Sequence, residues 1–462
     1  MSEQRPNVVV FFTDQQRWDA ATEHGNPLEL MPNFSRIAYR GTHLHNSFTC
    51  QPVCGPARSC WQTGQHATNT GVWHNGPSLK PDAVTLANCF NDAGYHTGYI
   101  GKWHLCRESR THVPAHDRGG YQSWLAANAL EFTSTAYETR MWDDNDNPVD
   151  LPGYRVDALA DAMIRHIDER SKSDQPFMLF SSFIEPHFQN HEDDYPPPDG
   201  YREKYAGRWT PPDLAALPSF REDEDAAVGG TAQRDLGGYW GMIKRLDEAL
   251  GRVLDALKSL RLLDNTIVLF TTDHGCHFKT RNNEYKRSCH ESSIRLPTAV
   301  QGPGFDGGGN RQELISLIDL PATLLDACGI DVPDAFEGRS FLPRLRGEGE
   351  WRDDMFVQIS EAQVGRAIRT SRWKYSVRAV DGTENGAGGA SAYREEFLYD
   401  LWCDPYELQN LIRFGSHDKV KEAMRQRLVR RMTEAGEAEP RIEPHETVAT
   451  HHRSVRDEHV WV

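Results

Sequence analysis

The sequence lacks a long apolar segment. No apolar run approaches the roughly 18 to 20 residues that a membrane-spanning helix needs, so we predict a protein that does not cross a membrane. Residues 1–6 are short and polar, and an apolar run at residues 7–12 follows them directly. This order does not match a secretory signal peptide, and we expect none.

Cysteine pairs with the spacing of redox or zinc motifs are also absent. The nine cysteines are odd in number and scattered, and none of them forms a Cys-x-x-Cys pair. The pattern indicates neither a disulfide framework nor a structural zinc site. We therefore predict a cytoplasmic protein whose thiols stay reduced.

An excess of positive charge is missing as well. The 51 Lys and Arg residues are outnumbered by 67 Asp and Glu residues, which gives a net charge of -16 at pH 7. This balance argues against general binding to nucleic acid or to an anionic membrane surface. An anionic substrate would need a local cluster of positive side chains.

Apolar runs alternate with helical patterns along most of the chain. The runs predict strands at residues 7–12, 97–100, 176–183, 266–270 and 296–300. Apolar spacing and helix stops predict helices at residues 35–39, 81–93, 156–169, 242–260 and 318–328. The alternation predicts a doubly wound α/β sheet. Residues 139–153 and 188–235 are expected to be irregular, the second as a substrate lid or a disordered surface loop.

The pattern of predicted secondary structure changes after residue 350. Short strands are predicted at residues 356–359, 367–370 and 373–377, a Gly-rich loop at 381–392 and a helix at 418–435. We predict a catalytic domain at 1–350, a small sheet-plus-helix domain at 351–436 and an extended arm at 437–462. The arm is expected to pack on a neighbouring subunit of a homo-oligomer, and disorder is the alternative.

Titratable side chains follow four of the predicted strands. They are Asp14, His104, His187 and the pair Asp273-His274. In open α/β sheets, ligands bind beyond the carboxyl ends of the strands. Each residue alone could be a structural polar group, but the four positions together predict a site at one edge of the sheet.

Residues 50–64 surround Cys54 with signals for the start of a helix. Pro56 suits the first turn of a helix, and Gly64 can close the helix at its far end. Cys54 would then lie just before the N-terminus, with Arg58 one turn inside. Free N–H groups, the helix dipole and the guanidinium would form an anion site around the sulfur. A buried structural cysteine at a helix start is the alternative interpretation.

The segment Cys54-Gly55-Pro56-Ala57-Arg58, with Thr63-Gly64 after it, resembles the formylglycine segment of sulfatases. In that family, a formylglycine-generating enzyme oxidises the cysteine of this Cys-x-Pro-x-Arg pattern. Ala57 stands where the family more often has Ser. Other segments resemble sulfatases in the same order, namely Asp14, residues 101–105, 186–187 and 272–275, Lys286, and residues 291–297, 336–340 and 398–405.

The resemblance implies an alkaline-phosphatase-like α/β/α sandwich with a smaller C-terminal antiparallel-sheet domain. It also implies one divalent metal held by Asp14, Gln15, Cys54 as formylglycine, Asp273 and His274. The Asp-Gln and Asp-His pairs resemble the branch that includes choline sulfatases and phosphonate monoester hydrolases. Oxygen ligands favour Ca²⁺ or Mg²⁺, and the imidazole extends the range to Mn²⁺, so Ca²⁺ is expected. Gln15 is either a ligand or a hydrogen-bond partner of one.

Catalytic roles in the resemblance fall to Cys54, Arg58, Lys102, His104, His187 and Lys286. A hydrated formylglycine offers two hydroxyls on one carbon, so one can attack sulfur and the other can release sulfate. His104 would take the proton of the second hydroxyl, while Arg58 and Lys102 would hold the hydrate. His187 and Lys286 would bind the transferred group and help to protonate the leaving oxygen.

The implied function is hydrolysis of an organic, and we expect a carbohydrate, O-sulfate ester. Phosphonate monoester and phosphodiester hydrolases use the same nucleophile and metal, so hydrolysis of those esters is the alternative. A catalytically inactive binding protein on the same scaffold is a third interpretation. The presence of Asp14, Cys54 and Lys286 counts against it.

Specificity is expected in the loops at residues 105–153 and 188–235. Trp124, Trp142 and Trp209 lie in these loops and could stack on sugar rings. Ordinary packing within the loops is the alternative for each of them.

Overall fold

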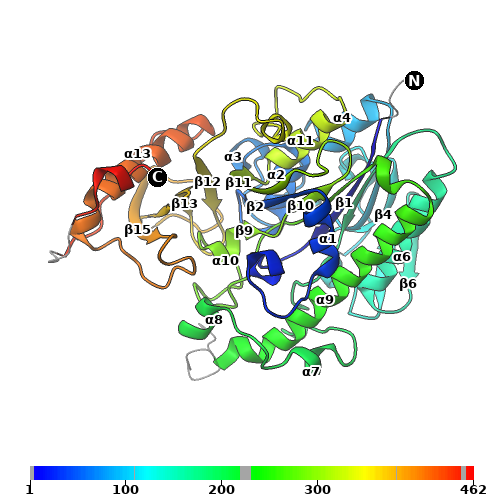
Figure 1. Ribbon diagram of the computed structural model, residues 1–462, viewed down its shortest axis with the longest axis horizontal. Helices are drawn as coiled ribbons and strands as arrows, with labels where there is room; N and C mark the ends of the chain where they lie inside the picture. Colours follow the sequence, from blue (N-terminus) through cyan, green and yellow to red (C-terminus); the bar gives the residue numbers. More distant parts are fainter. Residues whose placement is uncertain (1–4, 109, 219–229, 381, 449–453) are drawn as a thin grey trace.

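The computed structural model describes residues 5–108, 110–218, 230–380, 382–448 and 454–462 (Figure 1). A large mixed sheet contains β1 (Asn7–Thr13), β2 (Thr42–Phe48), β3 (His96–Lys102), β4 (Ser123–Ala127), β5 (Thr139–Trp142), β6 (Pro148–Leu151), β7 (Phe177–Ser182), β8 (Thr266–Thr272), β9 (Arg295–Leu296), β10 (Ala299–Gln301) and β11 (Gly309–Ser316). Its order is β11-β2-β10-β8-β1-β7-β3-β4-β5-β6, with β9 paired to β2.

Helices cover both faces of this sheet. They are α1 (Pro32–Arg40), α2 (Cys54–Thr63), α3 (Ala67–Thr70), α4 (Leu86–Asp92), α5 (Leu130–Thr133), α6 (Arg155–Arg170), α7 (Tyr201–Tyr205), α8 (Pro212–Ala216), α9 (Gly230–Ser259), α10 (Glu291–Ile294), α11 (Asp319–Ala327) and α12 (Leu342–Leu345). Val9 and Phe11 of β1 pack with α1, α6 and α9, whereas Val8, Val10 and Phe12 pack with α2, α4 and α11. The predicted α/β/α sandwich is confirmed.

Three predicted segments differ in type or extent from the structure, besides residues 296–300, which form the two short strands β9 and β10 rather than one strand. Residues 139–153 were predicted as loop but form the hairpin of β5 and β6. The Asp- and Asn-rich composition marks only the turn, where the Asp143 carboxylate accepts hydrogen bonds from the backbone N–H of Asn145 and Asn147. The helix predicted at 81–93 begins only at Leu86, because Thr85 caps it together with Asn88.

The third difference lies in residues 188–235, which were predicted as irregular. The described part contains α7 and α8, and α9 begins at Gly230 rather than at residue 242. Residues 219–229 lie outside the described residues. The prediction of a substrate lid in this stretch stays a prediction.

The smaller sheet contains β12 (Asp354–Ile359), β13 (Gly365–Thr370), β14 (Trp373–Ala379), β15 (Ala392–Asp400) and β16 (Arg441–Glu443). The first four strands are antiparallel in chain order, and β16 pairs parallel to β15. Helix α13 (Asp418–Glu434) packs on this sheet. The predicted antiparallel sheet is confirmed, while β15 and β16 are absent from the sequence-based prediction.

Residues 437–462 pack on their own small sheet where the structure describes them. The Trp373 indole Nε1 donates to the His459 carbonyl at 2.7 Å, and the Thr370 hydroxyl donates to the Val462 carbonyl at 2.6 Å. Val460 is buried in the core between the sheet and α13. These contacts attach the end of the chain to the small sheet of the same chain. The expected contact with a neighbouring subunit stays a prediction.

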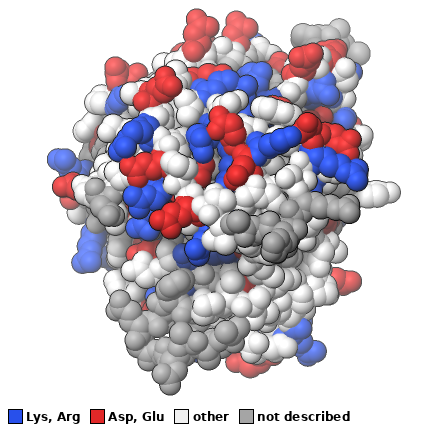
Figure 2. All heavy atoms as spheres, turned by 90° about the vertical axis from the view of Figure 1, so that its left-hand side faces the viewer, with Lys and Arg blue, Asp and Glu red and all other residues white. Residues whose placement is uncertain are grey.

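Ion pairs are dense around the small sheet. Figure 2 faces the side of the molecule that carries this sheet and α13, and basic side chains there are interspersed with acidic ones. Arg427, Arg430 and Arg431 of α13 all bind the buried carboxylate of Asp354, at 3.1, 2.6 and 2.6 Å. These pairs attach the helix to the first strand of the sheet.

Substitution Glu437→Gln should lower the free energy of unfolding by about 3 kcal/mol, because it leaves the buried Arg366 guanidinium without its charged partner. Arg366 Nε contacts Glu437 Oε1 at 2.8 Å, and the Arg366 side chain is 1% exposed. Chemical denaturation measures the change. Asp457→Asn is the matched control, because its pair with Lys419 is exposed and should change stability by less than about 1 kcal/mol. Equal effects of the two substitutions would contradict this account.

Among the described residues, no helix is both long enough and apolar enough to cross a membrane.

Candidate active site

The candidate site forms where the carboxyl ends of adjacent parallel strands meet. Strands β8, β1, β7 and β3 lie side by side and run parallel. Asp14 follows β1, Lys102 ends β3, His187 lies beyond β7, and Asp273 and His274 follow β8. The structure thus brings together the side chains that the sequence places after separate strands.

Cys54 occupies the first residue of α2 rather than the position before it. Gly64 closes the helix in a left-handed conformation, as predicted, with φ of 64°. The Cys54 side chain is buried, and its Sγ lies 2.9 Å from Lys286 Nζ. The same sulfur lies 3.2 Å from His274 Nε2 and 3.4 Å from Asp14 Oδ1. The Cys54 side chain therefore stands between a cation and two groups that can bind metal.

Four side chains could hold one metal ion. One ligand atom from each of Asp14, Cys54, Asp273 and His274 lies within 4.8 Å of the others, and all four residues are buried. His274 Nδ1 lies 2.9 Å from the Gly275 carbonyl oxygen, which can only accept, so Nδ1 carries the proton and Nε2 offers its lone pair to the site.

Gln15 is the fifth predicted ligand. Its Oε1 is buried and has no hydrogen-bond partner within the described residues, whereas its Nε2 contacts the Cys276 sulfur at 3.6 Å. An unsatisfied carbonyl oxygen suits a hard cation. The donor set, with two carboxylates, an amide oxygen and one imidazole, therefore fits the divalent metal that the sequence predicts.

Two buried cations balance the carboxylates. Lys102 Nζ contacts Asp14 Oδ2 at 2.8 Å, and an Arg58 amino group contacts Asp14 Oδ2 at 3.0 Å and Asp273 Oδ2 at 3.1 Å. The backbone before Lys102 has no room for a side chain, because Gly101 has φ of 108° and a Cβ there would lie 2.0 Å from the Ser182 carbonyl oxygen. Only glycine can therefore deliver Lys102 in this way.

The sequence analysis missed Glu131. This buried side chain of α5 contacts Lys102 Nζ through Oε1 at 3.1 Å. A single acidic residue in a short helix carries no sequence signal that would link it to a lysine on another strand. Glu131 therefore gives the Lys102 ammonium group a second carboxylate partner beside Asp14.

The environment keeps Cys54 and Lys102 charged. Burial raises the pKa of the Cys54 thiol, but Lys102, Lys286 and His274 together outweigh burial and hold that pKa well below its usual value. Burial lowers the pKa of Lys102, whereas Asp14, Cys54 and Glu131 raise it more. A negative group at position 54 is therefore stabilised in this site.

The pKa values of the Asp14 and Asp273 carboxylates are shifted in opposite directions. Burial raises the pKa of Asp14, but Lys102, His187 and Arg58 bring it below its usual value. Burial and the neighbouring Asp14 carboxylate raise the pKa of Asp273 to about 6. Two carboxylates that oppose each other's ionisation in this way favour a bound cation.

Two histidines complete the group around Cys54. His104 and His187 both interact with the Cys54 thiol. Burial and the positive charge of Lys286 lower the pKa of His187. His187 Nδ1 lies 2.7 Å from the Phe188 carbonyl oxygen and donates to it, which leaves Nε2 as the free nitrogen. All six residues predicted as catalytic therefore lie in one cluster.

The tryptophans predicted to stack on sugars lie in three different environments. Trp124 is buried and stacks on Tyr99, with ring centroids 5.2 Å apart. Trp209 packs against Trp240, with centroids 5.8 Å apart. Trp142 lines a cavity of about 730 Å³.

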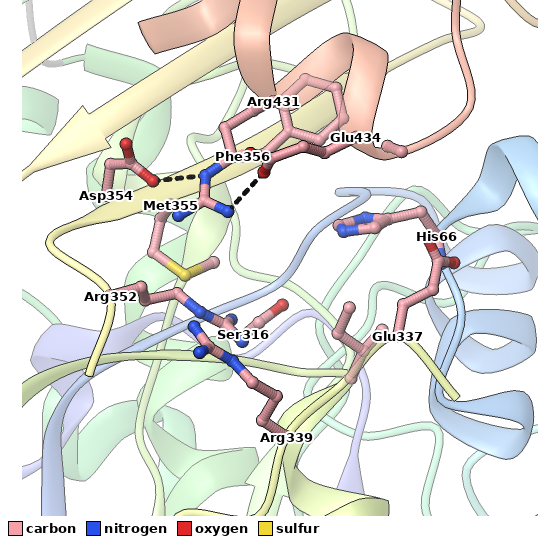
Figure 3. A pocket seen from close by; sticks show the side chains of 12 residues that line it. His66, Ser316, Glu337, Arg339, Arg352, Asp354, Met355, Phe356, Arg431 and Glu434 are labelled. Carbon is pink, nitrogen blue, oxygen red and sulfur yellow. Dashed lines mark hydrogen bonds and ion pairs between the residues drawn. The ribbon is translucent and has the colours of Figure 1, made fainter. Parts of the chain in front are cut away.

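A second cavity, of about 270 Å³, lies apart from the cluster around Cys54 (Figure 3). It is lined by His66, Ser316, Ile318, Glu337, Arg339, Arg352, Asp354, Met355, Phe356, Arg431, Glu434 and Ala435. Arg352 pairs with Asp319 at 2.8 Å, and Arg431 pairs with Asp354 at 2.6 Å. None of the predicted site residues lines this cavity.

A family model described as Sulfatase matches residues 6–330, more than half of the chain. The chain belongs to the sulfatase family. A second model, described as the C-terminal part of N-sulphoglucosamine sulphohydrolase, matches residues 283–434. The sequence-based assignment to sulfatases is thereby confirmed, and the protein is an enzyme of this class.

Curated relatives span nearly the whole sulfatase. An ulvan-active sulfatase of Formosa agariphila is 27% identical over 448 residues, covering 94% of this chain and 82% of the relative. An N-acetylglucosamine-6-O-sulfatase of Bacteroides thetaiotaomicron is 24% identical, covering 90% of this chain and 84% of the relative.

Solved structures share the fold over almost the same length. The yidJ protein of Bacteroides fragilis superposes with a TM-score of 0.82 at 25% identity, covering 95% of this chain and 97% of that chain. A phosphonate monoester hydrolase of Agrobacterium radiobacter superposes with a TM-score of 0.70 at 23% identity, covering 93% of this chain and 96% of that chain. The second likeness concerns the fold alone.

Proposed function

We propose that this sulfatase hydrolyses an O-sulfate ester of a carbohydrate, with formylglycine at position 54 as the nucleophile. The observation that carries the proposal is the position of the Cys54 sulfur, 2.9 Å from Lys286 Nζ and 3.4 Å from Asp14 Oδ1. A nucleophile at this position meets a cation on one side and a metal ligand on the other. This arrangement suits attack on a tetrahedral anion.

Conversion of Cys54 needs a formylglycine-generating enzyme as partner. Cys54 is only 1% exposed in the folded chain, so conversion precedes folding. We place this step and the mature enzyme in the cytoplasm, where the thiols of the nine cysteines, all of them free in the structure, stay reduced. The hydrated aldehyde then supplies two hydroxyls on one carbon, one for attack and one for product release.

One divalent metal would be held by Asp14, Gln15, Asp273, His274 and the modified side chain at position 54. When bound, it supplies positive charge that favours the ionised nucleophile and polarises the ester oxygens. Ca²⁺ suits the oxygen-rich donor set, and Mg²⁺ or Mn²⁺ are the alternatives.

The remaining side chains bind charge and move protons. Arg58 and Lys102 orient the modified residue at position 54 and offset the negative charge of the reacting group. His104 accepts a proton from that residue when sulfate is released. Lys286 Nζ binds the sulfate oxygens, and His187, in its protonated form, donates the Nε2 proton to the leaving oxygen.

The carbohydrate part of the proposal rests on the cavity beside α5. Phe132, Tyr137 and Trp142 line this cavity of about 730 Å³ together with Arg110 and His191. Phe132 directly follows Glu131, which contacts Lys102 of the catalytic cluster, so the cavity adjoins the site through α5. Aromatic rings beside a guanidinium suit a sulfated sugar, and the relatives' names point to the same substrate class.

A substrate panel tests the proposal. We expect kcat/KM for a sulfate ester to exceed that of the matched phosphonate monoester by at least about tenfold, equivalent to about 1.4 kcal/mol of transition-state stabilisation. Sulfated monosaccharides should also be hydrolysed with higher kcat/KM than simple aryl sulfates. A phosphonate preference of about tenfold or more would establish the alternative function.

Two tryptophan variants locate the sugar contact within this panel. Trp142→Ala should lower kcat/KM for sugar sulfates and leave aryl sulfates unaffected. Trp209→Ala is the matched control, because Trp209 packs on Trp240 and does not line the cavity. Equal losses for both substrate types in Trp142→Ala would contradict the assignment of this cavity to the sugar.

A further inference from the structure

Three histidines far from one another in sequence meet outside the catalytic cluster. His24 ends the 3₁₀ helix η2 (Thr22–His24), and His43 and His45 lie two residues apart on β2. Alternate residues of a strand point to the same face, so both β2 imidazoles face His24. One ring nitrogen from each of the three lies within 4.8 Å of the others. His43 is buried, and the other two are half-buried.

We propose that His24, His43 and His45 form a second metal site, which binds a transition-metal cation of the Zn²⁺ class. The distance between His24 Nε2 and His43 Nε2 is 3.3 Å. Two nitrogens bound at about 2.0–2.1 Å to a tetrahedral Zn²⁺ are separated by about 3.3–3.4 Å. The two rings therefore already stand at the separation that a shared cation requires.

A hydrogen bond between two neutral imidazoles is the competing explanation for this distance. That bond would satisfy one nitrogen of His24 and one of His43. It would leave the His45 ring unused, although His45 Nδ1 is buried and without a hydrogen-bond partner among the described residues. Buried polar atoms without partners are uncommon, so a hydrogen bond accounts for only part of the cluster. Coordination uses all three rings.

The chemistry of the cluster selects the class of cation. Three imidazoles and no carboxylate suit Zn²⁺, Cu²⁺ or Ni²⁺, whereas Ca²⁺ and Mg²⁺ require oxygen ligands. The Arg295 guanidinium opposes any cation here, since it donates to the His45 carbonyl at 3.0 Å. Glu291, which lies 3.8 Å from Arg295, offsets part of this charge. Only a metal with strong affinity for imidazole can bind against the remaining positive charge of Arg295. With three protein ligands, one coordination position of the metal stays open.

This site is distinct from the catalytic one in ligand type. The catalytic cluster offers two carboxylates and a single imidazole, whereas the second site offers nitrogen alone. The second site would tie η2 to the start of β2, the strand that leads into the Cys54 segment. Its role would be to fix this connection rather than to take part in the reaction.

Metal stoichiometry of the full chain tests the proposal. After equilibrium dialysis against Zn²⁺, elemental analysis should find about one equivalent fewer in His45→Gln than in the unsubstituted chain. Any Zn²⁺ at the catalytic cluster cancels in this difference, so the result does not depend on the proposed reaction. His166→Gln is the matched control, because His166 is also half-buried and lies beside another histidine, His96, with ring centroids 5.8 Å apart.

A second measurement keeps the test independent of folding defects. Zn²⁺ should raise the melting temperature of the unsubstituted chain and of His166→Gln, but not that of His45→Gln or His43→Asn. Circular dichroism establishes that each variant is folded before dialysis. Equal Zn²⁺ content in the unsubstituted chain and a folded His45→Gln variant would overturn the site, and so would an equal loss in His166→Gln.

Discussion

Replacement of Cys54 by alanine should lower kcat by about 10⁴-fold or more while the chain still folds. Cys54 has close contacts to Lys286, His274 and Asp14, and it is the one cysteine among the four described residues that could hold the metal. Alanine removes the reacting atom but keeps the first residue of α2 helical. Steady-state turnover of a sulfate ester, together with circular dichroism, measures the effect.

The same prediction has a chemical readout. Peptide mass spectrometry of active enzyme should show an aldehyde at position 54, and its fraction should scale with kcat across preparations. Cys328→Ala is the control, because Cys328 is a buried cysteine after α11, remote from the site residues in the fold. This variant should keep both the aldehyde and the turnover. Full activity in material that carries only the unmodified thiol would refute the role of Cys54.

The central part of the fold could be predicted because its strands are buried on both faces. All seven residues of β1 and of β8 are buried, and the middle of each strand is an apolar run, at residues 8–12 and 267–270. The ends of these runs place Asp14 and Asp273 correctly, because parallel strands end at the same edge of a sheet. The sequence alone was enough to predict a strand where a single apolar pattern covers most of that strand.

Contacts between distant residues could not be predicted in this way. Glu131 lies in a four-residue helix, and only the three-dimensional arrangement brings it to Lys102. The three histidines of the second metal site are separated by up to 21 residues, and no ligand spacing marks them. Trp124 occupies a loop-like stretch of sequence, yet its pairing in β4 buries it in the core.

Removal of the divalent metal should lower turnover by about 1,000-fold, equivalent to about 4 kcal/mol of transition-state stabilisation. The reason is electrostatic, since Asp14 and Asp273 are buried together and the negative nucleophile at position 54 adds a third charge. Chelation followed by dialysis measures the loss. Ca²⁺, Mg²⁺ and Mn²⁺, added separately, should restore turnover, with Ca²⁺ effective at the lowest concentration.

The variant Gln15→Asn tests the ligand set within this experiment. Gln15 has φ of 65°, a conformation that asparagine tolerates, so the substitution shortens the side chain without backbone strain. If Oε1 binds the metal, the concentration for half-maximal reactivation should rise by about tenfold or more. An unchanged concentration would remove Gln15 from the ligands. Repeating the titration in His45→Gln separates the catalytic metal from the second site. Undiminished turnover in a chain that elemental analysis finds metal-free would overturn the metal assignment altogether.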